Sequence, residues 1–171
     1  MSDRREPPAD PAFAERIVAW QKQHGRHALP WQGTRDPYRV WLSEIMLQQT
    51  QVATVLAYYE RFTARFPDVA ALAAANLGDV LASWSGLSYY SRARNLHRCA
   101  QAVVAEHGGE FPTTSVALAQ LAGIGRSTAA AIAAFCFGER VAILDGNVKR
   151  VLTRVLAFDA ELSDVSAQRD L

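Results

Sequence analysis

The stretch that decides the fold reads Leu-Ala-Gln-Leu-Ala-Gly-Ile-Gly-Arg-Ser-Thr over residues 118–128. After an Ala-rich apolar run it continues as Val-Ala-Ile-Leu-Asp-Gly-Asn-Val-Lys-Arg over residues 141–150. Gly123 and Gly125 lie between segments that both favour helix, so the backbone can turn sharply there and expose consecutive N–H groups. A helix is predicted to begin near Ser127, where orphan N–H groups and the helix dipole favour an anion such as a nucleic-acid phosphate.

Asp145 follows this hairpin and lies between the apolar residues 141–144 and Gly146, with Lys149 about one helical turn further on. Two alternatives stay open at this level. A Gly-x-Gly segment can be a turn and nothing more, and an Asp before Gly often forms a turn or caps a helix, here one predicted over residues 147–156. The order and spacing of the two features resemble the helix-hairpin-helix, Gly/Pro-rich loop and Asp signature of the base-excision DNA glycosylase superfamily.

Composition limits the fold and the mode of binding. A chain of 171 residues, half of them hydrophobic, can form one or two lobes with proper cores, and the lack of sustained strand alternation predicts an all-α fold. The net charge is only +1, so any DNA contacts must come from local placement of arginines. Cys99 and Cys136 lie in apolar helical runs, which predicts no disulfide and no metal site.

The termini and apolar runs carry no targeting signal. Residues 1–11 are polar and Pro-rich, which predicts a disordered tail and not a signal peptide. The longest apolar run, residues 129–137, is too short to span a bilayer. A cytoplasmic protein is therefore expected.

Glu44 is the second candidate for chemistry. It lies in a helix predicted over residues 38–62 and has apolar neighbours on both sides, a setting that would raise its pKa and keep a proton available near neutrality. Gln48 is predicted one turn further along the same helical face, with Gln49 beside it. The alternative is that Glu44 is a solvated surface residue, which is the commoner role of a lone Glu in a helix.

Two aromatic segments are further candidates. Trp31 lies in a Pro-bounded loop over residues 29–37 and is either a hydrophobic plug between lobes or a ligand contact. Residues 84–90 form an aromatic turn that leads into the Arg-rich start of a helix continuing over residues 95–107. There, arginines can hold phosphates while Tyr89 wedges into the base stack; the alternative is an aromatic packing corner with solvated arginines.

From about Phe13 to about Phe158 the chain resembles the A/G-specific adenine DNA glycosylase (MutY) family. The motifs that carry the resemblance are Leu-Pro-Trp (29–31), Trp-Leu-Ser-Glu-Ile-Met-Leu-Gln-Gln-Thr-Gln-Val (41–52), Gly-Leu-Ser-Tyr-Tyr-Ser-Arg-Ala-Arg-Asn (86–95), Gly-Ile-Gly-Arg-Ser-Thr (123–128) and Leu-Asp-Gly-Asn-Val-Lys-Arg (144–150).

The resemblance implies an all-α fold of the endonuclease III type, with two helical lobes and a DNA-binding cleft between them. Residues 12–37 would supply the N-terminal helix and loop of a cluster-side lobe. Residues 38–144 would form a helical barrel lobe with the helix-hairpin-helix at 115–137, and residues 145–171 the catalytic Asp loop and a return helix.

The function implied by the resemblance is that of a base excision repair enzyme. It would hydrolyse the N-glycosidic bond of adenine mispaired with 8-oxoguanine or guanine in double-stranded DNA, after flipping the adenine out of the duplex. Glu44 would be the general acid that protonates the adenine. Asp145 would stabilise the oxocarbenium-like transition state, directly or through a covalent adduct. A monomer is expected.

The resemblance also assigns residues that contact DNA or substrate. Gln49 and Tyr89 would insert near the mispair. Gly123 and Gly125 would offer N–H groups to a phosphate. Arg26 and Trp31 would help wall the adenine pocket. The full set expected to bind DNA or substrate is Arg26, Trp31, Gln48, Gln49, Leu87, Tyr89, Gly123, Gly125, Ser127 and Lys149. The related endonuclease III branch has a nucleophilic lysine where this chain has Ser127, so a monofunctional glycosylase without strand cleavage is expected.

The chain departs from the family pattern at three places. Ala122 replaces a Pro before the first hairpin Gly, and Ser88 replaces a Gly, so Ser88 would be strained if its position requires positive φ. The sequence ends at Leu171, whereas family members continue into a four-cysteine [4Fe–4S] loop and a domain that recognises 8-oxoguanine. The cluster ligands are expected beyond residue 171, because Cys99 and Cys136 cannot replace four thiolates.

Two further expectations follow from this comparison. Without the helices that complete the N-terminal lobe, the apolar face of residues 13–20 is expected to be underpacked. The alternative to an active enzyme is a catalytically inactive helix-hairpin-helix fragment that binds DNA without excising a base.

Overall fold

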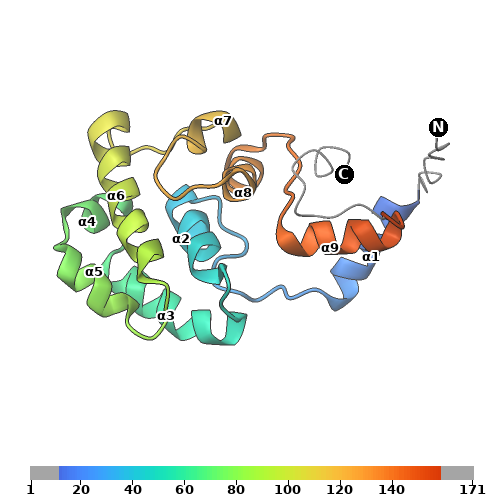
Figure 1. Ribbon diagram of the computed structural model, residues 1–171, viewed down its shortest axis with the longest axis horizontal. Coiled ribbons are helices and arrows are strands. Elements are labelled where there is room, and N and C mark those ends of the chain that lie inside the picture. The colour runs from blue at the N-terminus through green and yellow to red at the C-terminus, as the bar shows by residue number, and fades with distance from the viewer. Residues whose placement is uncertain (1–11, 159–171) are drawn as a thin grey trace. The chain divides into compact units, whose positions relative to one another are not determined.

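The computed structural model describes residues 12–158, and every regular element among them is a helix (Figure 1). The all-α fold predicted from the sequence is therefore confirmed for this part of the chain. It divides into two compact units: Ala28–Ile143, and the described parts of Met1–His27 and Leu144–Leu171. The predicted tail at residues 1–11 and the end of the predicted return helix lie outside the described residues.

The larger unit contains seven of the helices that the structure describes. They are α2 (Pro37–Leu47), α3 (Val52–Arg65), α4 (Val69–Ala74), α5 (Leu77–Trp84), α6 (Tyr90–His107), α7 (Ser115–Leu118) and α8 (Arg126–Phe137). Short polar residues fix several starts, since the side chains of Asp36, Asp68, Asn76 and Thr114 each accept a hydrogen bond from a first-turn amide.

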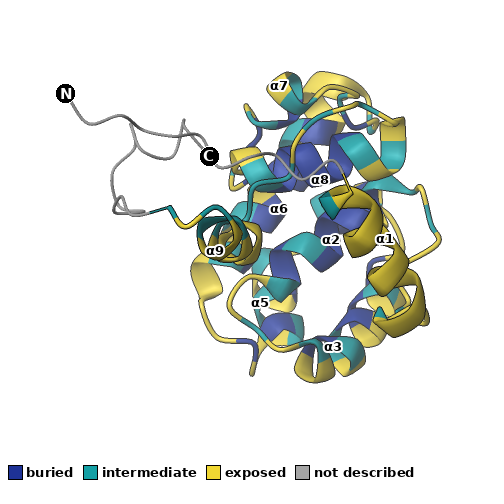
Figure 2. Ribbon diagram, turned by 90° about the vertical axis from the view of Figure 1, so that its right-hand side faces the viewer, coloured by how far each residue is buried: buried dark blue, intermediate teal, exposed yellow. Residues whose placement is uncertain are grey.

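The core of this unit forms around α2 and α6. Helix α6 packs against α4, α5 and α2, and α2 packs also against α3 and α8. The buried residues of these helices run from Tyr38 to Met46 on α2, from Ala93 to Val103 on α6 and from Thr128 to Ala133 on α8 (Figure 2). The largest side chains that are completely enclosed include Trp41, Trp84, Tyr59 and Phe62. Enclosed rings of this size contribute much of the apolar burial that holds such a unit together.

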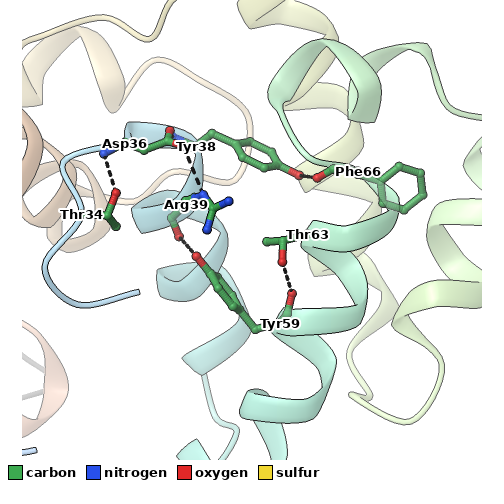
Figure 3. Close-up of polar contacts among 7 residues, drawn as sticks. All are labelled: Thr34, Asp36, Tyr38, Arg39, Tyr59, Thr63 and Phe66. Carbon is green, nitrogen blue, oxygen red and sulfur yellow. Dashed lines mark hydrogen bonds and ion pairs between the residues drawn. The ribbon is translucent and has the colours of Figure 1, made fainter. Parts of the chain in front are cut away.

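Hydrogen bonds fix the start of α2 against α3 (Figure 3). The Tyr38 hydroxyl donates to the Phe66 carbonyl oxygen at 2.6 Å, and the Tyr59 hydroxyl donates to the Arg39 carbonyl oxygen at 3.3 Å. The Asp36 carboxylate lies 3.5 Å from the Arg39 guanidinium and also caps the helix. These contacts fix the position of α2 along α3. Glu44, a residue of α2, is positioned with it.

The predicted single helix over residues 38–62 is wrong. The structure has two helices, α2 and α3, separated by residues 48–51, and Gln49 in this break has a left-handed backbone with φ of 57°. The cause is tertiary and not local. The Arg92 side chain donates to carbonyl oxygens at the end of α2, including that of Gln48 at 2.7 Å, and so terminates the helix there.

The smaller unit contains α1 (Phe13–His24) and α9 (Gly146–Val155), and neither helix has a buried residue. Ile17, Val18 and Trp20 on α1 are 47%, 51% and 60% exposed, which agrees with the expectation of an underpacked apolar face. None of the helices within residues 12–158 combines the length and apolar character needed to cross a membrane.

Candidate nucleic-acid interface

The hairpin between α7 and α8 is shaped by its two glycines in different ways. Gly123 has φ of 76°, and a Cβ there would lie 2.7 Å from the Cβ of Asn95 on α6. Gly125 has φ of −79° and is the N-cap of α8, where it offers no side chain to its first-turn N–H groups. Helix α8 begins at Arg126, so the start predicted near Ser127 is confirmed to within a residue. No side chain caps the first-turn amides of α8, and their binding of an anion stays a prediction.

Glu44 lies on α2 in a largely apolar setting. The adjacent Ser43 and Ile45 are buried, as are Leu42 and Met46, whereas Glu44 itself is half-buried. The predicted apolar flanks are therefore confirmed, and the predicted rise in its pKa stays a prediction. The half-buried position leaves the Glu44 carboxyl partly accessible from outside, as a general acid requires.

Two loops of the larger unit carry the residues expected to enter DNA. Gln48, the C-cap of α2 four residues after Glu44, and Gln49 in the break between α2 and α3 are both exposed. Tyr89 is 56% exposed at the start of α6, with φ of 48°. Leu87 is only 3% exposed and packs in the core, so in this conformation its side chain is not available to a ligand.

A small cavity lies between the loop that follows α2 and the hairpin. It has a volume of about 30 Å³, enough for a water molecule. It is lined by Trp41, Ile45, Gln48, Arg92, Asn95, Leu96, Ala122 and Gly123. The structure therefore brings together the end of α2, the start of α6 and the hairpin, although these segments are far apart in the sequence.

The remaining predicted residues of the larger unit have mixed settings. Trp31 packs edge-on against Tyr59, with ring centroids 5.2 Å apart, and contacts the core, which favours the role of a hydrophobic plug. Ser127 is half-buried in the first turn of α8. The position equivalent to the nucleophilic lysine of the related branch therefore carries only a hydroxyl.

Arg26, Asp145 and Lys149 belong to the smaller unit. One Asp145 carboxylate oxygen accepts hydrogen bonds from the amides of Asn147 and Val148, at 2.9 and 2.7 Å. The capping alternative for Asp145 is therefore confirmed, and it does not exclude a catalytic role. Lys149 lies one turn into α9, and Arg26 is exposed in the segment after α1.

Arg92 is the residue whose role sequence reasoning missed. The expectation that the arginines at the start of α6 hold phosphates is wrong for Arg92, because its guanidinium turns inward and binds protein carbonyl groups. Arg94 and Arg98, two and six residues further along α6, are exposed. Only the position of Arg92 within the aromatic turn motif distinguishes it in the sequence, and that signal is weak.

The cysteines do not fit a [4Fe–4S] cluster, which the family resemblance implies. Burial raises the pKa of the Cys99 thiol to about 12 and that of Cys136 to about 11, Asp36 adding to the second shift. The whole chain has two cysteines, whereas a cluster is held by four thiolates. Within the described residues, no group of three or more His, Cys, Asp or Glu side chains is arranged to hold a metal ion.

Comparisons with known proteins agree on a family. The family model described as HhH-GPD superfamily base excision DNA repair protein matches residues 42–171. The chain is 48% identical over 147 residues to the adenine DNA glycosylase of Buchnera aphidicola subsp. Baizongia pistaciae (strain Bp), covering 86% of this chain and 42% of that protein. It is 44% identical over 169 residues to the adenine DNA glycosylase of Homo sapiens, covering 94% of this chain and 31% of that protein. The chain thus spans less than half the length of both relatives.

Solved structures share the fold. A thermostable thymine-DNA glycosylase superposes with a TM-score of 0.78 at 27% identity, covering 83% of this chain and 65% of that one. Endonuclease III in a non-covalent complex with DNA superposes with a TM-score of 0.73 at 20% identity, covering 91% of this chain and 74% of that one. The fold expected to be of the endonuclease III type is therefore confirmed.

Proposed function

Because the chain belongs to the HhH-GPD superfamily of base excision DNA repair proteins, we propose that it carries the catalytic residues of an adenine-specific DNA glycosylase. Its substrate is adenine mispaired with 8-oxoguanine or guanine in double-stranded DNA, which it binds as a monomer. The two relatives described above are adenine DNA glycosylases, which supports adenine as the target base. They also favour an enzyme over the alternative of an inert DNA-binding fragment.

The setting of Glu44 is the observation that carries this proposal. Its half-buried carboxyl lies on α2, one turn before the exposed residues Gln48 and Gln49 and in the same unit as the hairpin. An adenine flipped from the duplex needs a proton on a ring nitrogen before it leaves as a neutral base, and a partly accessible carboxyl beside the flipped base can supply that proton. Glu44 is the general acid of the proposed reaction.

Asp145 has the complementary role. Cleavage of the glycosidic bond leaves positive charge on the sugar, and a carboxylate that stays ionised stabilises it. Two amide donors already bind one Asp145 oxygen, which fixes the orientation of the side chain. Two carboxyl groups with separate protonation states divide the work, as in hydrolysis of other glycosidic bonds.

The hairpin and the two exposed loops bind the DNA. The uncapped amides of α8 take a backbone phosphate, while Gln49 and Tyr89 enter the duplex beside the mispair. Ser127 provides no amine in the hairpin, so the reaction is hydrolysis without a Schiff base, and the DNA strand stays intact.

Single-turnover excision tests this function. A labelled duplex with one A:8-oxoguanine pair is incubated with excess protein, and half of each sample is then treated with alkali. The proposed function predicts strand breaks only in the alkali-treated half, and none with a matched A:T duplex. Breaks before alkali would contradict the monofunctional mechanism. The absence of breaks from protein that is helical by circular dichroism would contradict the proposed activity.

A further inference from the structure

Two loops of the larger unit hold residues in unfavourable backbone conformations. Gln49 lies in the first loop, residues 48–51, with φ of 57°. Ser88 and Tyr89 lie in the second, residues 85–89, with φ of 59° and 48°. Residues with a Cβ rarely adopt this region, and such conformations persist only where surrounding contacts determine them.

A single side chain contacts both loops. Nη1 of Arg92 donates to the carbonyl oxygen of Gln48 at 2.7 Å, and Nη2 donates to Thr50 Oγ1 at 3.1 Å, both in the first loop. The same Nη2 donates to the carbonyl oxygen of Leu87 in the second loop at 2.9 Å. Nη1 also donates to the carbonyl oxygens of Ile45 and Met46, at 2.9 and 3.0 Å. The guanidinium therefore ties the end of α2 and both loops to α6.

The aromatic residues of the second loop complete this arrangement. The guanidinium carbon lies 5.5 Å from the ring centroid of Trp84 and 5.4 Å from that of Tyr89. The Trp84 indole N–H in turn donates to the Ser88 carbonyl oxygen at 3.2 Å. Arg92 thus contacts the ring of Tyr89 and, through Trp84, the backbone that orients it.

The partners of Arg92 distinguish it from a surface arginine. Its guanidinium donates to four backbone carbonyls and one hydroxyl, and burial lowers its pKa. Because the partners are backbone carbonyl oxygens, the guanidinium is bound to the backbone of both loops. Moving either loop would break a charge-assisted hydrogen bond. A lysine has a single ammonium on a flexible stem and cannot bond both loops in the same geometry.

We propose that Arg92 is a positioning residue that holds the Gln49 loop and the Tyr89 loop in one fixed arrangement, so that both side chains enter the duplex together. The proposal rests on the proposed function, in which Gln49 and Tyr89 lie beside the mispair. Unstacking a duplex is costly, and a wedge made of two separate loops is effective only if neither loop gives way. Arg92 touches no substrate in this role and acts through the backbone of both loops.

The first test needs no DNA. Amide hydrogen exchange is followed by NMR in the wild-type chain and in Arg92→Lys, at Thr50 in the first loop and at Leu87 in the second. The Thr50 amide donates to the carbonyl oxygen of Leu47 at the end of α2, at 3.3 Å, and the Leu87 amide donates to that of Trp84 at the end of α5, at 3.0 Å. We expect both to exchange about ten-fold faster in Arg92→Lys, while the hairpin amide of Ile124 is unchanged. Faster exchange in only one loop, or in neither, would overturn the coupling.

The second test measures the effect on DNA. A duplex carries 2-aminopurine next to the adenine of an A:8-oxoguanine pair, so that unstacking raises its fluorescence. We expect Arg92→Lys to lose most of the fluorescence rise and to slow adenine release about ten-fold or more, while the affinity for a matched duplex stays about the same. Arg92→Met should behave like Arg92→Lys. Arg65→Met, which removes an exposed arginine paired with Asp79, is the matched control and should behave as wild type.

The two tests separate the possible failures. A wild-type chain that neither unstacks the duplex nor releases adenine would overturn the proposed function, and the positioning role with it. If the wild-type chain does both, a full fluorescence signal in Arg92→Lys would overturn the positioning role alone.

Discussion

Gly123 and Asn95 are in such close contact that a Cβ at Gly123 would lie 2.7 Å from the Cβ of Asn95. This contact seats the hairpin against α6, one turn from Arg92 and beside the small cavity that Gln48 also lines. The hairpin is therefore attached to the same helix that orients both exposed loops. A change in this contact should affect stability and phosphate binding together.

Gly123→Ala should destabilise the chain by about 2 kcal/mol or more, because the new methyl group needs both a left-handed backbone and space that Asn95 occupies. Gly125→Ala is the matched control, since its φ is negative and nothing lies near the added Cβ. It should change the free energy of unfolding by less than about 1 kcal/mol. Urea denaturation followed by circular dichroism measures both, and equal losses would contradict the account.

Ser88→Gly should stabilise the chain by about 1 kcal/mol, because glycine adopts φ of 59° without the strain that a Cβ introduces. The hydrogen bond from Trp84 to the Ser88 carbonyl does not depend on the side chain and is kept. Ser91→Gly in the first turn of α6 should instead cost about 0.5 kcal/mol. A lower melting temperature for Ser88→Gly would show that the backbone at this position is not strained.

Substitutions of Asp145 separate its capping role from its proposed catalytic role. Asp145→Asn keeps an oxygen that can accept from the amides of α9, so the helix should remain, whereas Asp145→Ala should weaken α9 by about 1 kcal/mol. Both should slow adenine release by about 100-fold or more, since neither has a charge to stabilise the sugar cation. Hydrogen exchange on α9 and single-turnover kinetics give the two readouts. Normal excision by Asp145→Asn would leave only the capping role.

Stability should fall in alkaline solution. Burial raises the pKa of Cys99 from 9.0 to about 12 and also raises the pKa values of Tyr38 and Tyr59 above 10.0. These groups ionise more easily in the unfolded chain than in the folded one. Their contribution to the free energy of unfolding is therefore complete below about pH 9 and is lost as the pH rises toward their folded pKa values.

Each such group should lower the free energy of unfolding by at most about 1.4 kcal/mol per pH unit within its window. Cys99→Ala should therefore flatten the decline in melting temperature between about pH 9 and pH 12. Tyr90→Phe, at a residue that is 44% exposed, is the control and should keep the wild-type decline. An equal slope in wild type and Cys99→Ala would contradict burial of this thiol.

Local patterns in the sequence were sufficient to predict most of the helices and the hairpin. The start of α8 and the cap at Asp145 depend on glycines and short polar residues next to the elements they shape, so sequence alone placed them well. The apolar flanks of Glu44 could be predicted for the same reason. These features need no information from distant parts of the chain.

The break between α2 and α3 could not be predicted in this way. Residues 38–62 read as a continuous helix, whereas in the structure Arg92, over 40 residues later, binds the last carbonyls of α2. The same guanidinium binds the carbonyl oxygen of Leu87, so these contacts join segments that are distant in the sequence. Tertiary hydrogen bonds of this kind outweigh local propensity and leave little trace in the sequence.

Glu44 is proposed to supply the proton for adenine excision. The most direct measurement is the single-turnover rate constant for adenine release from an A:8-oxoguanine duplex, compared between wild type, Glu44→Gln and Glu106→Gln, an exposed carboxyl on α6. The account predicts a loss of about 100-fold or more for Glu44→Gln with unchanged duplex affinity, and a wild-type rate constant for Glu106→Gln. A wild-type rate constant for Glu44→Gln would contradict it.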